Sequence, residues 1–254
     1  MTSKNMNANI KVQSILKGKQ NILAVVAHPD DFEDYFSGTM LIAIEEGWIK
    51  PENINLLIVT DGSNGSRGNI VDPKVLKKLR HEEQMKALDQ VGIPRENCHF
   101  LDFKDGYVHN NDNQLTERIS YFIRKLKPDL LLTHNGFEAI IERQSGMYYV
   151  HKDHRVVGQA ALDAAYPYSR DLLFFPEHHK EGLEGHFLLE VLIAETQNPN
   201  VKVDITAKMP EKIALLKNFM SQIESDDWLY KYFKDTTGEG DRYLESYKYV
   251  KIII

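Results

Sequence analysis

Short apolar runs alternate with longer amphipathic stretches along the first two thirds of the chain. Residues 21–27, Asn-Ile-Leu-Ala-Val-Val-Ala, form an unbroken β-rich run, which is typical of a strand covered on both faces in a parallel sheet. Similar runs predict strands at 53–60, 98–101 and 129–133. Apolar positions at helical spacing predict helices at 36–47, 74–91, 115–126 and 151–166. Strands alternating with helices imply right-handed crossovers, so we expect an α/β fold with a mostly parallel sheet flanked by helices on both faces.

The remaining segments carry weaker signals. Residues 1–20 predict a loose arm or a short helix, and the prolines and histidines of 167–179 indicate a loop region. The last part of the chain is predicted to contain two strands, a helix and a tail of mixed signals, at 187–195, 201–206, 208–223 and 226–254. Because no repeat or low-complexity tract interrupts this order, we interpret the chain as one continuous unit.

Composition then narrows the classes of function. The 254 residues are 42% hydrophobic with a formal net charge of −6, so no global positive field would attract nucleic acid. The apolar runs are far shorter than the roughly 20 residues that a bilayer helix needs, and the polar N-terminus lacks the apolar stretch of a secretory signal. A single cysteine, Cys98, cannot form an intramolecular disulfide. We therefore expect a cytoplasmic protein without a membrane span.

Two clusters of polar residues stand where an α/β sheet binds its ligands, at the carboxyl ends of strands. The first strand runs directly into Ala27-His-Pro-Asp-Asp31, and His151-Lys-Asp-His154 begins the predicted helix at 151–166. Pro29 ends ladder pairing, so the polar side chains beside it project from a rigid loop. His151 and His154 are three residues apart and share one face of the helix.

These clusters contain the donors of a catalytic zinc site. Such a site takes imidazole nitrogens and a carboxylate at about 2.0–2.2 Å and keeps one position for water. His28, Asp31 and His154 can supply that set, which leaves Asp30 to take a proton from the water. Each half has a simpler interpretation, as a polar turn or, for Asp153, as a helix cap. The presence of both halves at the expected sheet edge favours a site.

Taken together, these motifs resemble the LmbE/PIG-L family of metal-dependent deacetylases. The resemblance covers roughly residues 21–166 and continues at Val203-Asp-Ile-Thr206, which a lysine-containing helix follows. It rests on the two clusters and on Glu33, Gly38, Thr39, Thr60-Asp-Gly62, Arg80-His-Glu-Glu83, Thr133-His134 and Arg155. The family implies a Rossmann-like α/β fold and hydrolysis of N-acetyl groups from N-acetylglucosamine-type substrates with zinc. We therefore expect an N-terminal arm at 1–20 and a single deacetylase domain at 21–254.

The resemblance also implies roles for individual residues. The metal ligands would be His28, Asp31 and His154, and Asp30 would be the general base. His151 would stabilise the oxyanion or protonate the leaving amine, with Asp153 orienting it. The metal would polarise the acetyl carbonyl and lower the pKa of its water, and either His151 or the protonated Asp30 could serve the amine. Zinc is the expected cofactor, with another divalent ion such as Fe²⁺ as the alternative.

The resemblance also implies substrate contacts, and parts of the sequence depart from the family pattern. Arg67 and Asp105 lie where the sugar-contacting residues of the family tend to fall, although a solvated arginine and a turn aspartate are equally good interpretations. Phe32 stands where many members carry a third acid, and Tyr35-Phe-Ser37 replaces a smaller stretch, which would make this wall of the pocket bulkier. Residues 137–150 form a longer segment that could be a substrate lid.

Several other polar residues have structural explanations. Arg80 and Glu83, three apart on a helix, are expected to form an ion pair, and His134 could line the site, support it or pack. His178-His179 is not expected to chelate a metal, since neighbouring residues in an extended loop rarely do so together. Cys98 is expected to be a small buried hydrophobe. A nucleotide cofactor is disfavoured, because the Gly-Lys-Ser/Thr and Gly-x-Gly-x-x-Gly motifs are absent.

The sequence thus predicts a zinc-dependent deacetylase acting on an N-acetylated amino sugar or its glycoconjugate. One alternative is a metal-dependent amidase on a non-sugar or thiol-conjugate amide. Another is a sugar-binding protein of the same fold that has lost turnover through a bulky Tyr35-Phe36 wall. The expected partner is a small molecule rather than nucleic acid, and a homo-oligomer is compatible with the sequence.

Overall fold

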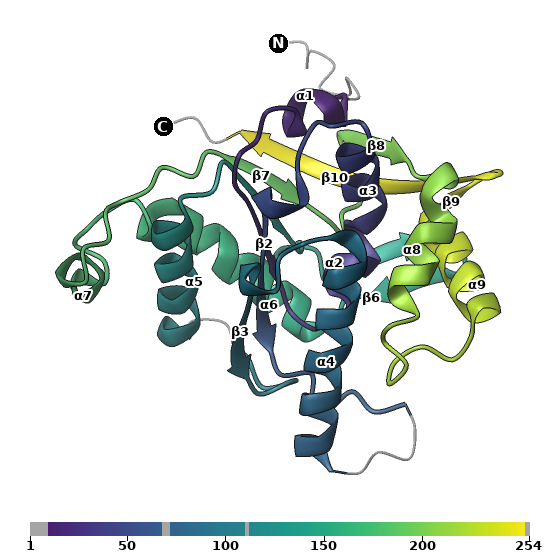
Figure 1. Cartoon of the computed structure of the whole chain (residues 1–254), viewed down its shortest axis with the longest axis horizontal. Helices are drawn as coiled ribbons and strands as arrows, with labels where there is room; N and C mark the ends of the chain where they lie inside the picture. Colours follow the sequence, from purple (N-terminus) through teal and green to yellow (C-terminus); the bar gives the residue numbers. More distant parts are fainter. Residues whose placement is uncertain (1–9, 68–71, 110–111, 252–254) are drawn as a thin grey trace.

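The computed structural model describes residues 10–67, 72–109 and 112–251, in which strands and helices alternate (Figure 1). The elements of the first half are α1 (Val12–Leu16), β1 (Ile22–Val26), α2 (Asp31–Tyr35), α3 (Ser37–Glu45), β2 (Ile54–Thr60), α4 (Pro73–Val91), β3 (Cys98–Phe103), α5 (Asn113–Leu126) and β4 (Leu130–Thr133). The second half contains β5 (Ile140–Arg143), β6 (Gly146–Tyr149), α6 (Lys152–Asp163), α7 (Pro176–Lys180), β7 (Glu190–Ile193), β8 (Val201–Asp204), α8 (Met209–Leu216), α9 (Asp226–Thr237), β9 (Gly238–Glu239) and β10 (Arg242–Lys251).

The main sheet has the strand order β3-β2-β1-β4-β7-β10-β8 among the described residues. β1 pairs in parallel with β2 and β4, and the β2–β3 and β4–β7 pairs are parallel too. β10 runs antiparallel to both β7 and β8. The expectation of a mostly parallel sheet is therefore confirmed, and the antiparallel strand lies in the tail whose pattern was mixed.

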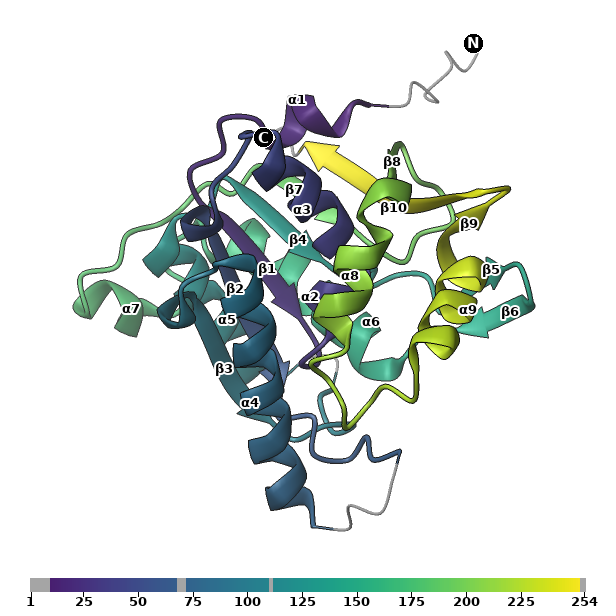
Figure 2. The same cartoon turned by 45° about the vertical axis from the view of Figure 1, so that its right-hand side comes forward.

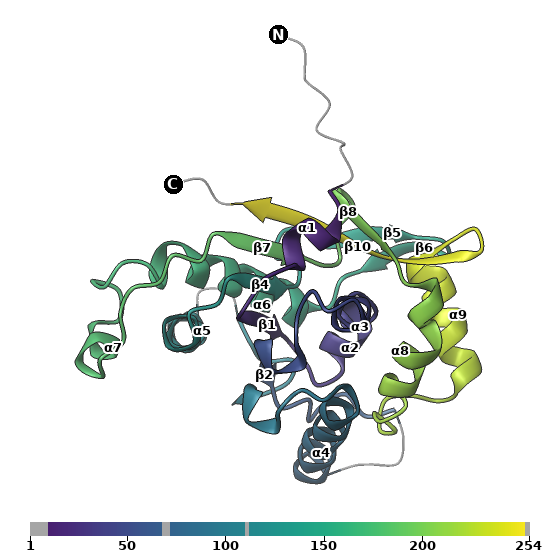
Figure 3. The same ribbon diagram turned by 45° about the horizontal axis from the view of Figure 1, so that its top comes forward.

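Helices cover both faces of this sheet, as predicted. Alternate residues of β1 enter two different cores: Ile22 and Ala24 pack with residues of α2, α3 and α8, whereas Leu23 and Val25 pack with residues of α5 and α6. In Figure 2, α3, α4 and α8 lie in front of the strands and α5 and α6 behind them. Viewed from above in Figure 3, α5 and α6 are likewise separated from α3 and α4 by β1. The carboxyl ends of the parallel strands consequently meet at one edge, where we expect a ligand.

Several elements differ from the sequence prediction. The helix expected at 36–47 corresponds to α3, and a separate short helix, α2, comes before it, with Phe36 between the two. The helix expected at 208–223 ends early, at Leu216. The loop expected at 167–179 contains the start of α7. The described part of segment 1–20 includes α1, whose apolar side chains join the core. None of the described helices is both long and apolar enough to cross a membrane.

Candidate active site

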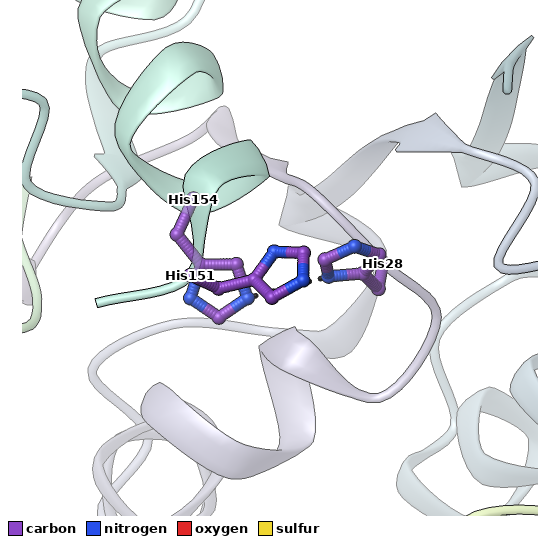
Figure 4. Close-up of side chains that lie close together, drawn as sticks. All are labelled: His28, His151 and His154. Atoms are coloured by element: carbon purple, nitrogen blue, oxygen red, sulfur yellow. Dashed lines mark hydrogen bonds between the residues drawn. The ribbon is translucent and has the colours of Figure 1, made fainter. Parts of the chain in front are cut away.

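The two predicted clusters come together at the carboxyl edge of the sheet. His28 follows β1, Asp31 is the first residue of α2, His151 is the N-cap of α6 and His154 lies in the first turn of that helix. Figure 4 shows the imidazoles of His28, His151 and His154 gathered in one place. Residues separated by more than a hundred positions thus share one site.

Close packing of α6 against the sheet brings His154 to this edge. Gly158, one turn further along α6, faces the end of β4, and a Cβ atom there would lie 2.3 Å from the carbonyl oxygen of His134. Any side chain at this position would push the helix away. The glycine therefore helps to set the distance between His154 and the residues that follow β1.

The three expected metal ligands face one another. His28 Nδ1 lies 3.3 Å from His154 Nε2, and Asp31 approaches the two rings with different oxygens, Oδ2 at 3.4 Å from His28 Nδ1 and Oδ1 at 3.3 Å from His154 Nε2. A tetrahedral ion with ligand bonds of about 2.0–2.2 Å spaces its ligand atoms roughly 3.3–3.6 Å apart. All three side chains are buried. The donor types, spacing and burial fit a divalent metal ion such as zinc.

Neighbouring donors widen the choice of ligands. Among the described residues, three sets have ligand atoms within 4.8 Å of one another, and the first shares a histidine with each of the others: His28 with His151 and His154, Asp31 with His134 and His154, and His28 with Asp105 and Asp153. Both nitrogens of His134 already have partners, since Nε2 accepts a hydrogen bond from the Ala27 amide and Nδ1 lies 3.0 Å from Glu195. The expected ligand set combines members of these overlapping sets.

Carboxylates on the outer side of each imidazole fix which nitrogen faces inward. His154 Nδ1 lies 2.8 Å from Glu195 Oε2, and His28 Nε2 lies 3.2 Å from Asp105 Oδ1. When these outer nitrogens donate to the carboxylates, two unprotonated nitrogens face each other across the site, an arrangement that a cation stabilises. Burial would lower the pKa of His28, but its contacts with Asp105, Asp153 and Asp31 outweigh this and raise it to about 10. The site therefore attracts positive charge.

Sequence reasoning missed Glu195. Its carboxylate also accepts a hydrogen bond from the Tyr35 hydroxyl (2.9 Å), so it holds His154, His134 and Tyr35 together. Burial favours its neutral form, yet His154 and His134 hold the pKa of Glu195 well below its usual range. Its position two residues after the buried end of β7 was the available signal, because an acidic residue near a carboxyl strand end lies at the ligand edge.

Asp30 lies beside this cluster in a strained backbone conformation. Its φ of 99° falls in the left-handed region, where residues other than glycine are rare and strain often marks function. Arg80 Nη2 donates to Asp30 Oδ2 at 2.9 Å. Burial raises the pKa of Asp30 to about 6, although the positive charge of Arg80 opposes the shift. The carboxylate borders the cavity at the site.

The predicted Arg80–Glu83 ion pair is wrong. Arg80 instead donates to Asp30 and to the carbonyl oxygens of Pro29 and Gly62, whereas Glu83 accepts hydrogen bonds from the amide and hydroxyl of Ser221. Helical spacing indicates which residues share a face, but the loop after β1 offers this buried guanidinium more acceptors than one carboxylate does. Arg80 therefore belongs to the site.

His151 and Asp153 are both present, but with other contacts than expected. His151 is exposed, and its Nδ1 accepts a hydrogen bond from the backbone amide of Asp153 (3.2 Å). The Asp153 carboxylate, expected to orient His151, accepts from the Gly106 amide at 2.7 Å and lies 3.5 Å from His28 Nε2. In this structure the carboxylate therefore contacts His28 and the Gly106 amide.

A cavity of about 650 Å³ opens over these residues. Its floor includes the metal-ligand candidates, and its rim comes from three distant segments, through Arg67, the β5–β6 hairpin and α9. The segment expected as a lid thus contributes Arg143 and Tyr148. The volume lies within the range of about 300–1,000 Å³ that is usual for small-molecule sites.

Arg67 and Asp105, the two expected substrate contacts, differ in the contacts that they make within the protein. Arg67 lines the cavity with its guanidinium 4.9 Å from the centre of the Trp228 ring. Asp105 also borders the cavity, but its Oδ2 accepts from the amides of Asn64 and Gly65 while Oδ1 faces His28. These internal contacts favour a role for Asp105 in positioning His28.

The residues expected to form a bulky wall, a histidine pair and a buried thiol have defined contacts in the structure. The bulky wall consists of Tyr35 alone, because Phe36 is fully buried and stacks on Tyr247 in the core. His178 contacts Arg124 and Glu117, so it serves a hydrogen-bonded cluster near α7. Cys98 is buried in β3, and burial raises the pKa of its thiol.

Comparison with known sequences points to one family. The sequence model described as "PIG-L: GlcNAc-PI de-N-acetylase" matches residues 23–165. A diacetylchitobiose deacetylase of Thermococcus kodakarensis is 25% identical over 253 residues, covering 95% of this chain and 87% of that protein. A probable N-acetyl-alpha-D-glucosaminyl L-malate deacetylase 2 of Bacillus anthracis is 24% identical, covering 91% of this chain and 94% of that protein.

Solved structures share the fold. An N,N'-diacetylchitobiose deacetylase from Pyrococcus horikoshii, complexed with an inhibitor, has a TM-score of 0.78 at 21% identity, covering 92% of this chain and 85% of that one. A 4-carboxy-2-hydroxymuconate hydratase from Pseudomonas putida has a TM-score of 0.68 at 19% identity, covering 92% and 97%. Since a hydratase shares this architecture, the reaction has to be argued from the site.

Proposed function

Because the chain belongs to the PIG-L family, we propose that it is a metal-dependent deacetylase of N-acetylglucosamine-type sugars or their conjugates. One observation carries the proposal: two buried imidazoles and a carboxylate face one another at distances of 3.3–3.4 Å, with Asp30 next to them on the floor of a cavity. The two curated relatives are named as deacetylases of acetylated sugars, which supports the same reaction.

The metal would be held by His28, Asp31 and His154. Two nitrogens and one oxygen suit zinc, and Fe²⁺ is the alternative, since imidazole and carboxylate serve both. When bound, such an ion polarises the amide carbonyl and lowers the pKa of a nearby water. Glu195 and Asp105 would orient the two imidazoles, as carboxylates behind metal-binding histidines commonly do.

Asp30 is proposed as the general base. Arg80 holds its Oδ2 atom, so Oδ1 would take the proton from the attacking water. Strained backbone and the contact with Arg80 both limit where the carboxylate can go. This restriction would keep the base aimed at the water, with little reorganisation during the reaction.

His151 is proposed to stabilise the developing oxyanion or protonate the leaving amine. Because its Nδ1 accepts a hydrogen bond from the Asp153 amide, the neutral ring carries its proton on Nε2, where it can donate. Protonated Asp30 is the other candidate donor to the amine. Both groups border the cavity, so either could reach the scissile bond.

The proposal also covers the residue that would contact the substrate and the location of the protein in the cell. Arg67 would contact sugar hydroxyls from the rim, and the substrate would be a small molecule. A cytoplasmic location is supported by the single cysteine, which is buried. The similarity to a hydratase structure at 19% identity shows the fold alone, so 4-carboxy-2-hydroxymuconate is a control substrate.

Acetate release tests the proposal. The full-length protein, loaded separately with Zn²⁺ and Fe²⁺, is incubated with N-acetylglucosamine, N,N'-diacetylchitobiose and an N-acetylglucosaminyl malate. An N-acetylated thiol conjugate without sugar and 4-carboxy-2-hydroxymuconate complete the panel. We expect stoichiometric acetate and free amine from at least one sugar. Turnover of only the thiol conjugate would favour the amidase alternative, and turnover of only the muconate would favour the hydratase.

A further inference from the structure

Arg143 differs from the buried arginines and from Arg67, which also lines the cavity but is exposed to solvent. Arg80 donates to one carboxylate and two carbonyl oxygens, and the buried Arg124 donates to five carbonyl oxygens. Arg143 is half-buried and lines the same cavity, yet its guanidinium has neither a hydrogen bond nor an ion pair with any described residue. Every Asp and Glu side chain of the protein lies within the described ranges. The protein therefore supplies no direct counter-ion.

Aromatic rings hold this guanidinium in place. Its central carbon lies 3.3 Å from the centre of the Tyr148 ring and 5.7 Å from that of Tyr232. Tyr232 stacks on Trp228 at 5.5 Å, and Arg67 covers Trp228. The stack therefore joins the β5–β6 hairpin, α9 and the loop at Arg67 along the rim. Ring contacts occupy the faces of a guanidinium and leave its N–H edge available for a ligand.

The local acidic group does not satisfy Arg143. Asp34 lies near enough for each charge to affect the other's pKa, but its Oδ2 accepts a hydrogen bond from the Tyr232 hydroxyl at 2.8 Å. A guanidinium has five N–H donors, and burying them partly without acceptors costs free energy. An oxyanion at the N–H edge would accept hydrogen bonds and so lower that cost. Carboxylate and phosphate both match the planar fork of arginine.

We propose that Arg143 binds an anionic oxygen group, a carboxylate or a phosphate, on the part of the substrate that extends beyond the acetylated sugar. This inference rests on the proposed deacetylase function and names its substrate class. The floor of the cavity would hold the N-acetyl group, and the β5–β6 hairpin would select conjugates that carry negative charge. Arg67, at the other end of the aromatic stack, would serve hydroxyl groups that charged and neutral substrates share.

The experiment compares kcat/KM for three substrates with the metal-loaded protein. N-acetylglucosaminyl malate carries carboxylates, N-acetylglucosamine 1-phosphate carries a phosphate, and methyl N-acetylglucosaminide is neutral. We expect at least one anionic substrate to be preferred, and Arg143→Gln to reduce the anionic-to-neutral ratio by roughly 10- to 100-fold, the usual range for a charge-assisted hydrogen bond. Whichever anionic substrate shows this loss identifies the group. Arg143→Lys should restore part of the ratio, because it keeps the charge without the fork.

Two further variants separate this role from general effects. Arg67→Gln is expected to lower kcat/KM for all three substrates while leaving their ratio unchanged. Arg95→Gln removes an exposed arginine that pairs with Asp89 away from the cavity, and should change neither quantity. An unchanged ratio in Arg143→Gln, or a wild-type preference for the neutral substrate, would overturn the proposal.

Binding keeps the two proposals distinguishable. Calorimetric titration of wild type and Arg143→Gln with N-acetylglucosamine 1-phosphate, N-acetylglucosaminyl malate and N-acetylglucosamine requires no turnover. Tighter binding of an anionic compound, lost in Arg143→Gln, would support the anion site even if no acetate is released and the deacetylase function fails. Equal binding of all three compounds by the wild type would reject the anion site whatever the enzyme's activity.

Discussion

The floor and the rim of the cavity are built in opposite ways. On the floor, His28 and His154 are buried and each has a carboxylate behind it. On the rim, Arg67 and Arg143 lie on aromatic rings and have no polar partner among the described residues. A floor with satisfied outer contacts holds its donors in one arrangement, whereas the rim keeps its donors available. We therefore expect chemistry and substrate choice to reside in separate parts of the molecule.

The chain order reinforces this contrast. The floor is formed where β1, β4 and β7 end and where α6 begins, so a rigid sheet sets its geometry. The rim is assembled from a loop, a two-stranded hairpin and α9, which are far apart in sequence (Figure 3). Rim residues can change without disturbing the sheet. We therefore expect substitutions on the floor to alter catalysis or metal binding, and those on the rim to alter substrate affinity.

The largest effect is expected for Asp30→Asn on the floor. Loss of the base should lower kcat by roughly 10²- to 10⁴-fold while bound metal, measured by elemental analysis, stays at the wild-type level. Asparagine tolerates the left-handed backbone of Asp30, so the fold should survive. Asp102→Asn is the matched control, because Asp102 also has a positive φ but lies outside the cavity lining. Wild-type turnover in Asp30→Asn would exclude Asp30 as the base.

A smaller effect is expected behind the floor, for Glu195→Gln. Both imidazoles contact one carboxylate oxygen and the Tyr35 hydroxyl donates to the other. Glutamine offers a single acceptor oxygen and no negative charge, so metal affinity should fall by about 10- to 100-fold. Competition with a chelator of known affinity measures this change. Glu190→Gln, at the opposite end of β7 and paired with Lys19, should leave the affinity unaltered. Equal affinities for the two variants would show that Glu195 does not support the metal site.

The smallest effect is expected on the rim, for Trp228→Ala. Loss of its contacts with Arg67 and Tyr232 removes about 0.5–1 kcal/mol at a partly exposed site, so KM should rise roughly two- to fivefold with unchanged metal content. Steady-state kinetics and elemental analysis check both parts. Tyr166→Ala removes a similar arginine–aromatic contact, made with Arg170 in the segment between α6 and α7 and outside the cavity lining, and should leave KM unchanged. Metal loss in Trp228→Ala would break the separation between floor and rim.

More of the floor than of the rim could be predicted from the sequence. The four strands at 21–27, 53–60, 98–101 and 129–133 were predictable because continuous apolar runs mark buried parallel strands. The motifs after β1 and at the start of α6 located the donors, since parallel strands end at a common edge. β10 was not predicted, because charged and aromatic residues alternate along it and resemble an amphipathic segment of either kind.

Contacts between distant segments remained beyond the sequence. Glu195 has no motif around it, and only the folded sheet brings it behind His154. Arg80 was assigned to its helical neighbour Glu83, whereas tertiary packing turns it to Asp30. That Arg143 has no polar partner among the described residues became visible only in the folded structure, where the position of every described carboxylate is known. Local patterns thus identify donors well, but their outer partners depend on the tertiary arrangement.

The most direct test is the zinc content of wild type and His154→Ala after equilibrium dialysis against limiting Zn²⁺. His186→Ala, which loses a histidine whose Nε2 contacts a backbone carbonyl oxygen, is the matched control. A four-coordinate site built on His28, Asp31 and His154 predicts about one zinc ion per chain in the wild type and the control, and none in His154→Ala. Full zinc retention by a folded His154→Ala protein would contradict the account.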